Sequence, residues 1–200
     1  MNTPLKQDPT ATRRRNRCAA VRRVTRGVVA SLVICAAAAV HAAEGVTPGT
    51  IRIGGVMDLK GDSRGLGLGM KAGIEAAIRD KQIQGRRLEF VTLNDNYSPT
   101  KTIEATRQLV AENIFAMVGN VGTPTAKVSL PILAENKVPA VGFFTGAGIL
   151  RPGIGDIINF RASYVQETAS VIQAAIDAGI PPTGVCAYVQ NDAYGMAGVT

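Results

Sequence analysis

Two segments carry hydroxyl groups where a small anion could bind. Gly119-Asn120-Val121-Gly122-Thr123-Pro124-Thr125 follows an apolar run, and Thr123 with Pro124 is typical of a helix N-cap followed by a first-turn proline. Backbone N–H groups at such a helix start can bind a carboxylate, to which the helix dipole contributes about 0.3–1 kcal/mol. The spacing alone is explained equally well by a helix cap with no ligand.

A second segment and an aromatic residue could complete this site. Phe144-Thr145-Gly146-Ala147-Gly148 follows the next apolar run and could place further N–H and C=O groups beside the first segment. Tyr194-Gly195, after the last apolar run, would add an aromatic face and a hydroxyl. Asp95 and Asp192 are the carboxylates nearest the ends of the runs. Neither has a partner at a spacing typical of acid–base catalysis or a metal site, so we interpret both as solvated loop residues or turn caps.

Other residue types argue against catalysis. The only histidine is His41, in the leader described below, so the rest of the chain cannot form a Ser-His-Asp or Cys-His site or a histidine-ligated zinc site. Cys186 lies in an apolar run and is interpreted as a buried structural thiol. Gly67-Leu68-Gly69-Met70-Lys71-Ala72 fits the dinucleotide fingerprint, but nine residues separate Met57, the end of the preceding run, from its first glycine. We therefore expect a flexible loop and close helix packing there, and no cofactor.

The elements that must position these residues alternate between strand and helix. Apolar β-branched runs predict strands over 51–57, 88–93, 114–118, 138–143 and 184–189, with an extended segment over 157–160. Helical periodicity predicts helices over 70–78, 100–113, 123–133 and 164–178. Because the strands are apolar throughout, the sequence predicts an α/β fold with a parallel sheet and helices on both faces. Ligands of such sheets bind beyond the carboxyl ends of the strands, where the segments above lie.

Charge separates the first 42 residues from the rest of the chain. Residues 1–42 contain eight of the 22 Lys and Arg residues and a single acidic one. The other 158 residues contain fourteen basic and fourteen acidic residues, which leaves a net charge of zero. A balanced surface of this kind lacks the basic patch that phosphate backbones attract, so we expect no nucleic-acid partner.

The first 42 residues have the pattern of a secretory signal peptide. A basic segment is followed by fourteen uncharged residues over 27–40 and by Val40-His41-Ala42, which predicts cleavage after Ala42 and a periplasmic protein. Fourteen residues are short for a membrane anchor, which needs about 20. A lipoprotein box ending at Cys35 and a twin-arginine signal at Arg22-Arg23 are weaker alternatives.

Seven segments that span nearly all of residues 45–200 have a recognisable order and spacing. They are Gly45-Val46-Thr47, Gln84-Gly85-Arg86, Asn94-Asp95-Asn96-Tyr97-Ser98-Pro99, Val118-Gly119-Asn120-Val121-Gly122-Thr123-Pro124-Thr125, Phe144-Thr145-Gly146-Ala147, Phe160-Arg161-Ala162-Ser163-Tyr164 and Gln190-Asn191-Asp192-Ala193-Tyr194-Gly195. Together they resemble the leucine/isoleucine/valine-binding branch of the extracytoplasmic solute-binding proteins of ABC transporters. The resemblance implies the type I periplasmic-binding-protein fold, in which two α/β lobes close over a ligand by a hinge. It implies a first lobe over 43–160 and the start of a second over 161–200, so we interpret the chain as an N-terminal fragment.

The resemblance also implies the site residues. Thr123 and the Thr145-Gly146-Ala147 segment would hold the carboxylate and ammonium of an amino acid, Tyr194 would close over it, and Tyr164 would stand near the lobe crossing. Leu66 occupies a position where relatives that bind branched-chain amino acids often carry an aromatic residue. Gly146 or Gly148 stands where they often carry a hydroxyl, so the identity of the ligand is left open.

The function implied is that of a receptor rather than an enzyme. We expect a monomer that binds a branched-chain amino acid or a similar small solute and delivers it to the membrane subunits of an ABC permease. One alternative is a ligand-sensing module for a histidine kinase or chemoreceptor with the same fold. A secreted nucleotide-dependent enzyme is a third and weaker interpretation.

Overall fold

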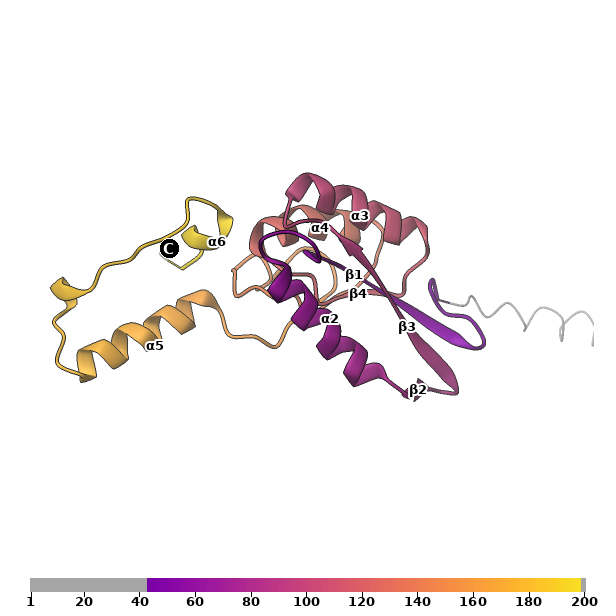
Figure 1. Ribbon diagram of the computed structural model, residues 1–200, viewed down its shortest axis with the longest axis horizontal. Coiled ribbons are helices and arrows are strands. Elements are labelled where there is room, and N and C mark those ends of the chain that lie inside the picture. Colours follow the sequence, from indigo (N-terminus) through magenta and orange to yellow (C-terminus); the bar gives the residue numbers. More distant parts are fainter. Residues whose placement is uncertain (1–42, 199–200) are drawn as a thin grey trace, which may run out of the picture. The chain divides into compact units, whose positions relative to one another are not determined.

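The computed structural model describes residues 43–198 (Figure 1). The predicted signal peptide, residues 1–42, lies outside the described residues, and the chain from Ala43 onward clusters as one unit. Within the described part of the chain, no helix is both long enough and apolar enough to cross a membrane.

A six-stranded sheet with the order β2-β3-β1-β4-β5-β6 organises the chain. Its parallel strands are β1 (Thr50–Met57), β3 (Arg86–Asn94), β4 (Ala116–Val118), β5 (Ala140–Val141) and β6 (Ile157–Ile158). The short β2 (Gln82–Ile83) pairs antiparallel with β3 as a hairpin at one edge. The predicted α/β fold with a mostly parallel sheet is confirmed, and the antiparallel edge strand was not foreseen.

The crossover connections place helices on both faces of the sheet. The helices are α2 (Arg64–Ile78), α3 (Pro99–Ala111), α4 (Thr123–Glu135) and α5 (Tyr164–Asp177), followed by the 3-10 turn η1 (Pro182–Gly184) and the short α6 (Ala193–Met196). From β1 the chain crosses to β3 on one side, then to β4 on the other. Since such crossovers are right-handed, α2 lies on the face opposite α3 and α4. This reversal beside β1 is the topological switch point, where α/β sheets bind ligands.

The core confirms the two-faced burial of the strands. The larger cluster lies between the sheet and the α3–α4 pair and includes Leu109, Met117, Leu130 and Phe143. A smaller cluster around Ile53 occupies the opposite face of the sheet. These faces follow from the sequence because alternate residues of a strand point to opposite sides.

Helix α2 begins six residues before its predicted start. Three glycines at its beginning lower the helix propensity and hide the periodicity there. Gly67 is the buried residue of this helix, and a Cβ at this position would lie 1.9 Å from the carbonyl oxygen of Asp58. The glycine therefore allows the helix to approach the chain that follows β1, which confirms the predicted close packing of this motif. The predicted flexible loop is wrong, because the motif lies within α2.

Two predictions fail after α5. Residues 184–189 form no strand; apart from the end of η1 they are irregular and exposed. A parallel strand depends on hydrogen bonds to a neighbour, and no strand among the described residues lies beside this segment. Cys186 is consequently an exposed free thiol and not a buried one. The division into lobes at residue 160 stays a prediction.

Candidate functional site

The start of α4 and the loop after β5 bring two buried hydroxyls together. Thr123 is the first residue of α4, and Gly122, with φ +109°, is the N-cap, so the predicted capping role of Thr123 is wrong. Its hydroxyl instead lies 2.6 Å from the hydroxyl of Thr145, and both residues are almost fully buried. Because a pair of hydroxyls uses one of its two protons internally, the other proton is available to an outside acceptor.

A short extension of the sheet aligns these two threonines. Val121 and Phe144 form a parallel bridge beyond β4 and β5. In it, Phe144 N–H donates to the Asn120 carbonyl at 2.7 Å and Gly122 N–H donates to the Phe144 carbonyl at 3.3 Å. The Ala147 N–H then donates to the Thr145 hydroxyl at 3.2 Å. The backbone therefore fixes the relative positions of both hydroxyls before any ligand is present.

Helix α4 adds an electrostatic preference for an anion. The N–H groups of a first helical turn have no acceptor within the helix, and Pro124 has no N–H to satisfy. The positive end of the helix dipole therefore lies beside the hydroxyl of Thr123. Hydroxyl protons, first-turn N–H groups and the dipole all favour the same chemistry, the binding of a small carboxylate.

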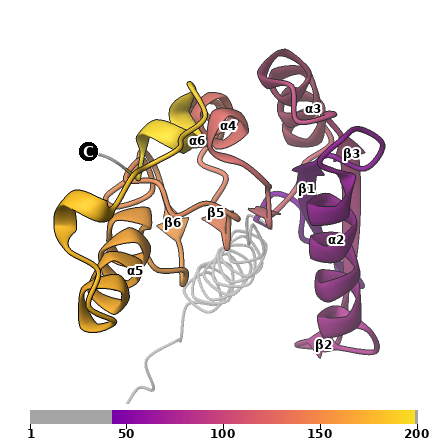
Figure 2. The same ribbon diagram turned by 60° about the vertical axis from the view of Figure 1, so that its left-hand side comes forward.

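Two tyrosines complete the group of residues that the sequence singled out. The Tyr164 N–H donates to the Gly146 carbonyl at 2.9 Å, and α5 begins there with a capping box between Ser163 and Gln166. The Tyr164 ring makes an edge-to-face contact with Tyr194, with ring centroids 5.4 Å apart. Helix α6, which carries Tyr194, contacts α4 (Figure 2). One chain of contacts thus joins all six predicted site residues, Thr123, Thr145, Gly146, Ala147, Tyr164 and Tyr194.

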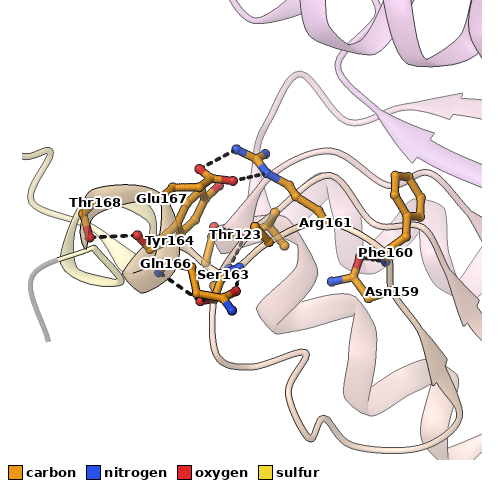
Figure 3. Close-up of polar contacts among 12 residues, drawn as sticks. Thr123, Asn159, Phe160, Arg161, Ser163, Tyr164, Gln166, Glu167 and Thr168 are labelled. Carbon is orange, nitrogen blue, oxygen red and sulfur yellow. Dashed lines mark hydrogen bonds and ion pairs between the residues drawn. The ribbon is translucent and has the colours of Figure 1, made fainter. Parts of the chain in front are cut away.

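Two arginines, which the sequence analysis missed, tie this group to the segment before α5. The Arg161 guanidinium lies 4.8 Å from the centre of the Phe144 ring and 5.1 Å from that of Tyr164. It also donates two hydrogen bonds to Glu167, at 2.9 and 3.0 Å (Figure 3). That pairing raises the pKa of Arg161 and lowers the pKa of Glu167. Arg151 donates to the carbonyls of Ala147 and Arg161, which holds the two segments together.

The two predicted loop carboxylates have different roles. Asp192 is the N-cap of α6 and accepts the N–H groups of Tyr194 and Gly195, as a turn cap does. Asp95 is fully buried, so the solvated alternative is wrong for it, but it caps the turn that follows β3 because its side chain accepts the Tyr97 N–H. Its two oxygens accept the Tyr97 N–H and the Thr102 hydroxyl, each at 2.8 Å. Burial raises the pKa of Asp95, and these hydrogen bonds oppose the increase.

An open apolar hollow adjoins the site. It has a volume of about 500 Å³ and is lined along α2 by residues that include Leu66, Met70 and Ile74. Phe144 lines its other side, next to Thr145 in the chain. Leu66, the position where relatives often carry an aromatic residue, is 51% exposed and lines this hollow. Within residues 43–198, no group of His, Cys, Asp and Glu side chains is arranged to hold a metal ion.

Comparisons with known proteins identify the family of this chain. The family model described as periplasmic binding protein matches residues 50–200. A possible leucine/isoleucine/valine-binding protein from Rhodopirellula baltica is 36% identical, with a TM-score of 0.71 over 76% of this chain and 43% of that one. A leucine-binding protein from Thermotoga maritima is 23% identical, with a TM-score of 0.59 over 65% of this chain and 38% of that one.

Ligands differ among the structural neighbours. A solute-binding protein from R. palustris, solved with benzoate, is 24% identical, with a TM-score of 0.61 over 66% of this chain and 38% of that one. At such identity this neighbour and the Thermotoga protein show the fold alone. A search of curated proteins finds no match. The chain spans less than half the length of these relatives. Several structural neighbours are described as solute-binding proteins of ABC transporters. The chain itself belongs to the periplasmic binding protein family.

Proposed function

We propose that this chain is part of the extracytoplasmic receptor of an ABC importer. The receptor binds a branched-chain amino acid or a similar small carboxylate between two lobes and delivers it to the permease. It works as a monomer in the periplasm, without catalysis, after cleavage of the signal peptide behind Ala42. The observation that carries this proposal is the buried hydroxyl pair of Thr123 and Thr145 at the start of α4.

The strength of such an anchor fits a receptor. A hydrogen bond to a charged group contributes about 1.5–3 kcal/mol, so three of them supply about 4.5–9 kcal/mol. Micromolar affinity requires about 8 kcal/mol. The hydroxyl pair and the first turn of α4 can therefore supply much of the binding free energy of a small carboxylate.

The surroundings of the anchor suit a ligand with an apolar body. Tyr164 and Tyr194 offer ring faces on one side, and Phe144 leads to the apolar hollow along α2. The names of two neighbours mention leucine and benzoate, which share a carboxylate and an apolar part. A carboxylate anchor beside apolar and aromatic side chains would serve either of these ligands.

Replacing Thr123 by valine tests the proposal with little change in side-chain shape. In the full-length protein we expect Thr123→Val to bind its ligand about 10- to 150-fold more weakly, because one charge-assisted hydrogen bond is lost. Isothermal titration with L-leucine and with benzoate measures this change. Thr100→Val is the matched control, since Thr100 is exposed at the start of α3. Equal affinities for Thr123→Val and the wild type would refute the assignment.

A further inference from the structure

We propose that Tyr97 is a third tyrosine of this ligand site, whose phenol group donates a hydrogen bond to an oxygen of the bound carboxylate. This inference rests on the proposed function and deepens it, because it adds a residue that determines affinity. Neither the spacing of the sequence nor the resemblance assigns a role to Tyr97.

The position of the Tyr97 ring is the first observation that supports this assignment. A Cβ on Gly122 would lie 2.5 Å from one ring carbon of Tyr97 and 2.8 Å from the carbon that bears its hydroxyl. In the same way, a Cβ on Gly146 would lie 2.8 Å from the Tyr164 ring. Gly122 directly precedes Thr123, and Gly146 directly follows Thr145. Each threonine of the hydroxyl pair is therefore next in sequence to a glycine that a tyrosine ring covers.

The backbone that presents Tyr97 is the second observation. Asn96 and Tyr97 are consecutive non-glycine residues with φ angles of +50° and +58°. L-residues disfavour this left-handed region, and such strain concentrates at functional sites. Buried Asp95 holds the conformation by accepting the Tyr97 N–H, while Thr102 fixes the other carboxylate oxygen. Asp95 is thus the positioning residue that keeps the ring against Gly122.

The free phenol group is the third observation. Among the described residues, no acceptor or donor forms a hydrogen bond with the Tyr97 hydroxyl, although the ring is partly buried. A phenol is protonated at neutral pH, and burial, followed by the nearby Asp192, Tyr164 and Tyr194, raises the pKa of Tyr97 further. A protonated phenol without a partner among these residues is suited to donate its proton to a ligand oxygen.

The position of Tyr97 also relates the site to the chain beyond α5. Tyr194 lies in α6, and Asp192 is the N-cap of that helix. Both residues influence the Tyr97 phenol electrostatically. Since α6 contacts α4, a ligand at the start of α4 would have Tyr97 and Tyr194 within reach. Tyr97 would therefore hold the ligand carboxylate against the hydroxyl pair, on the side opposite the Tyr194 ring that covers the ligand.

Tyr97→Phe in the full-length protein tests the proposal, with isothermal titration of L-leucine and of benzoate as probes. We expect affinity for the bound probe to fall about tenfold or more, with an unchanged melting temperature, because the ring remains and a charge-assisted hydrogen bond is lost. Thr100→Val again serves as the control, since Thr100 is exposed at the start of α3. We expect the control variant to bind the probe with the affinity of the wild type.

Three other outcomes separate the possible failures. If Tyr97→Phe binds like the wild type while Thr123→Val binds weakly, the role of Tyr97 is refuted and the proposed function stands. If the wild type binds neither probe, both proposals fail for these ligand classes. If Tyr97→Phe also lowers the melting temperature, tyrosine difference absorption tests the hydrogen bond directly. The proposal predicts that ligand binding changes the tyrosine absorption of the wild type and that Tyr97→Phe largely loses this change. A signal of the same size in both would overturn it.

Discussion

The crowding at Gly122 leads to a prediction about stability. The residue has a φ of +109°, and a Cβ there would lie 2.5 Å from the Tyr97 ring and 2.9 Å from the Thr125 hydroxyl oxygen. With its ψ of +149°, Gly122 adopts a backbone conformation that is essentially restricted to glycine, and forcing an L-residue into it costs about 1–3 kcal/mol. Overpacking in a well-packed region costs about 1–3 kcal/mol more. We therefore expect Gly122→Ala to lower the free energy of unfolding by about 2–6 kcal/mol.

A second glycine separates the two costs. Gly85 has a φ of +77°, but no atom lies within 4 Å of a Cβ built there, so Gly85→Ala measures the cost of a positive φ without crowding, about 1–2 kcal/mol. Urea denaturation of the wild type and both variants gives the comparison. Tyr97→Ala in the Gly122→Ala background should recover part of the crowding cost, since the atom that the new methyl group meets is removed. Equal destabilisation by Gly122→Ala and Gly85→Ala would refute the contact.

Two carboxylates predict opposite dependences of stability on pH. Burial raises the pKa of Asp95 above its ordinary value of 3.8, so its contribution to folding is largest at low pH and is lost as pH rises through the raised folded pKa. The stability difference between wild type and Asp95→Asn should therefore fall with rising pH; a difference that rises would contradict the burial argument. The hydrogen bonds from Arg161 lower the pKa of Glu167 below 4.5, so its contribution is present above that value and is lost as pH falls through the folded pKa. Denaturant titrations of Glu167→Gln should show this opposite trend, and a pH-independent difference would argue against the ion pair.

Hydrophobic patterning predicted much of the fold. Periodicity located α3 and α5 to within two residues at either end, and long apolar runs located β1 and β3. The failure at 184–189 has a physical reason: an apolar run acquires strand geometry only from a neighbouring strand, which the described residues do not provide. The late predicted start of α2 reflects glycines that serve close packing at Gly67 rather than helix propensity.

The candidate site was predictable where it depends on strand ends, and not where it depends on loop conformation. Thr123 and Thr145 follow neighbouring parallel strands, so their proximity follows from the topology. The presentation of Tyr97 depends on a buried carboxylate and two left-handed residues, which no spacing rule encodes. The stacking of Arg161 on two rings likewise arises from how loops meet in space.

Native mass spectrometry of the protein purified from the periplasm of its own host tests the central claim most directly. The account predicts a one-to-one adduct with the mass of a small carboxylic acid, which is lost on denaturation and is weakened or absent in Thr123→Val. Tandem fragmentation of the released adduct would identify the ligand. No adduct in the wild type, or an adduct retained equally by Thr123→Val, would contradict the carboxylate anchor at the start of α4.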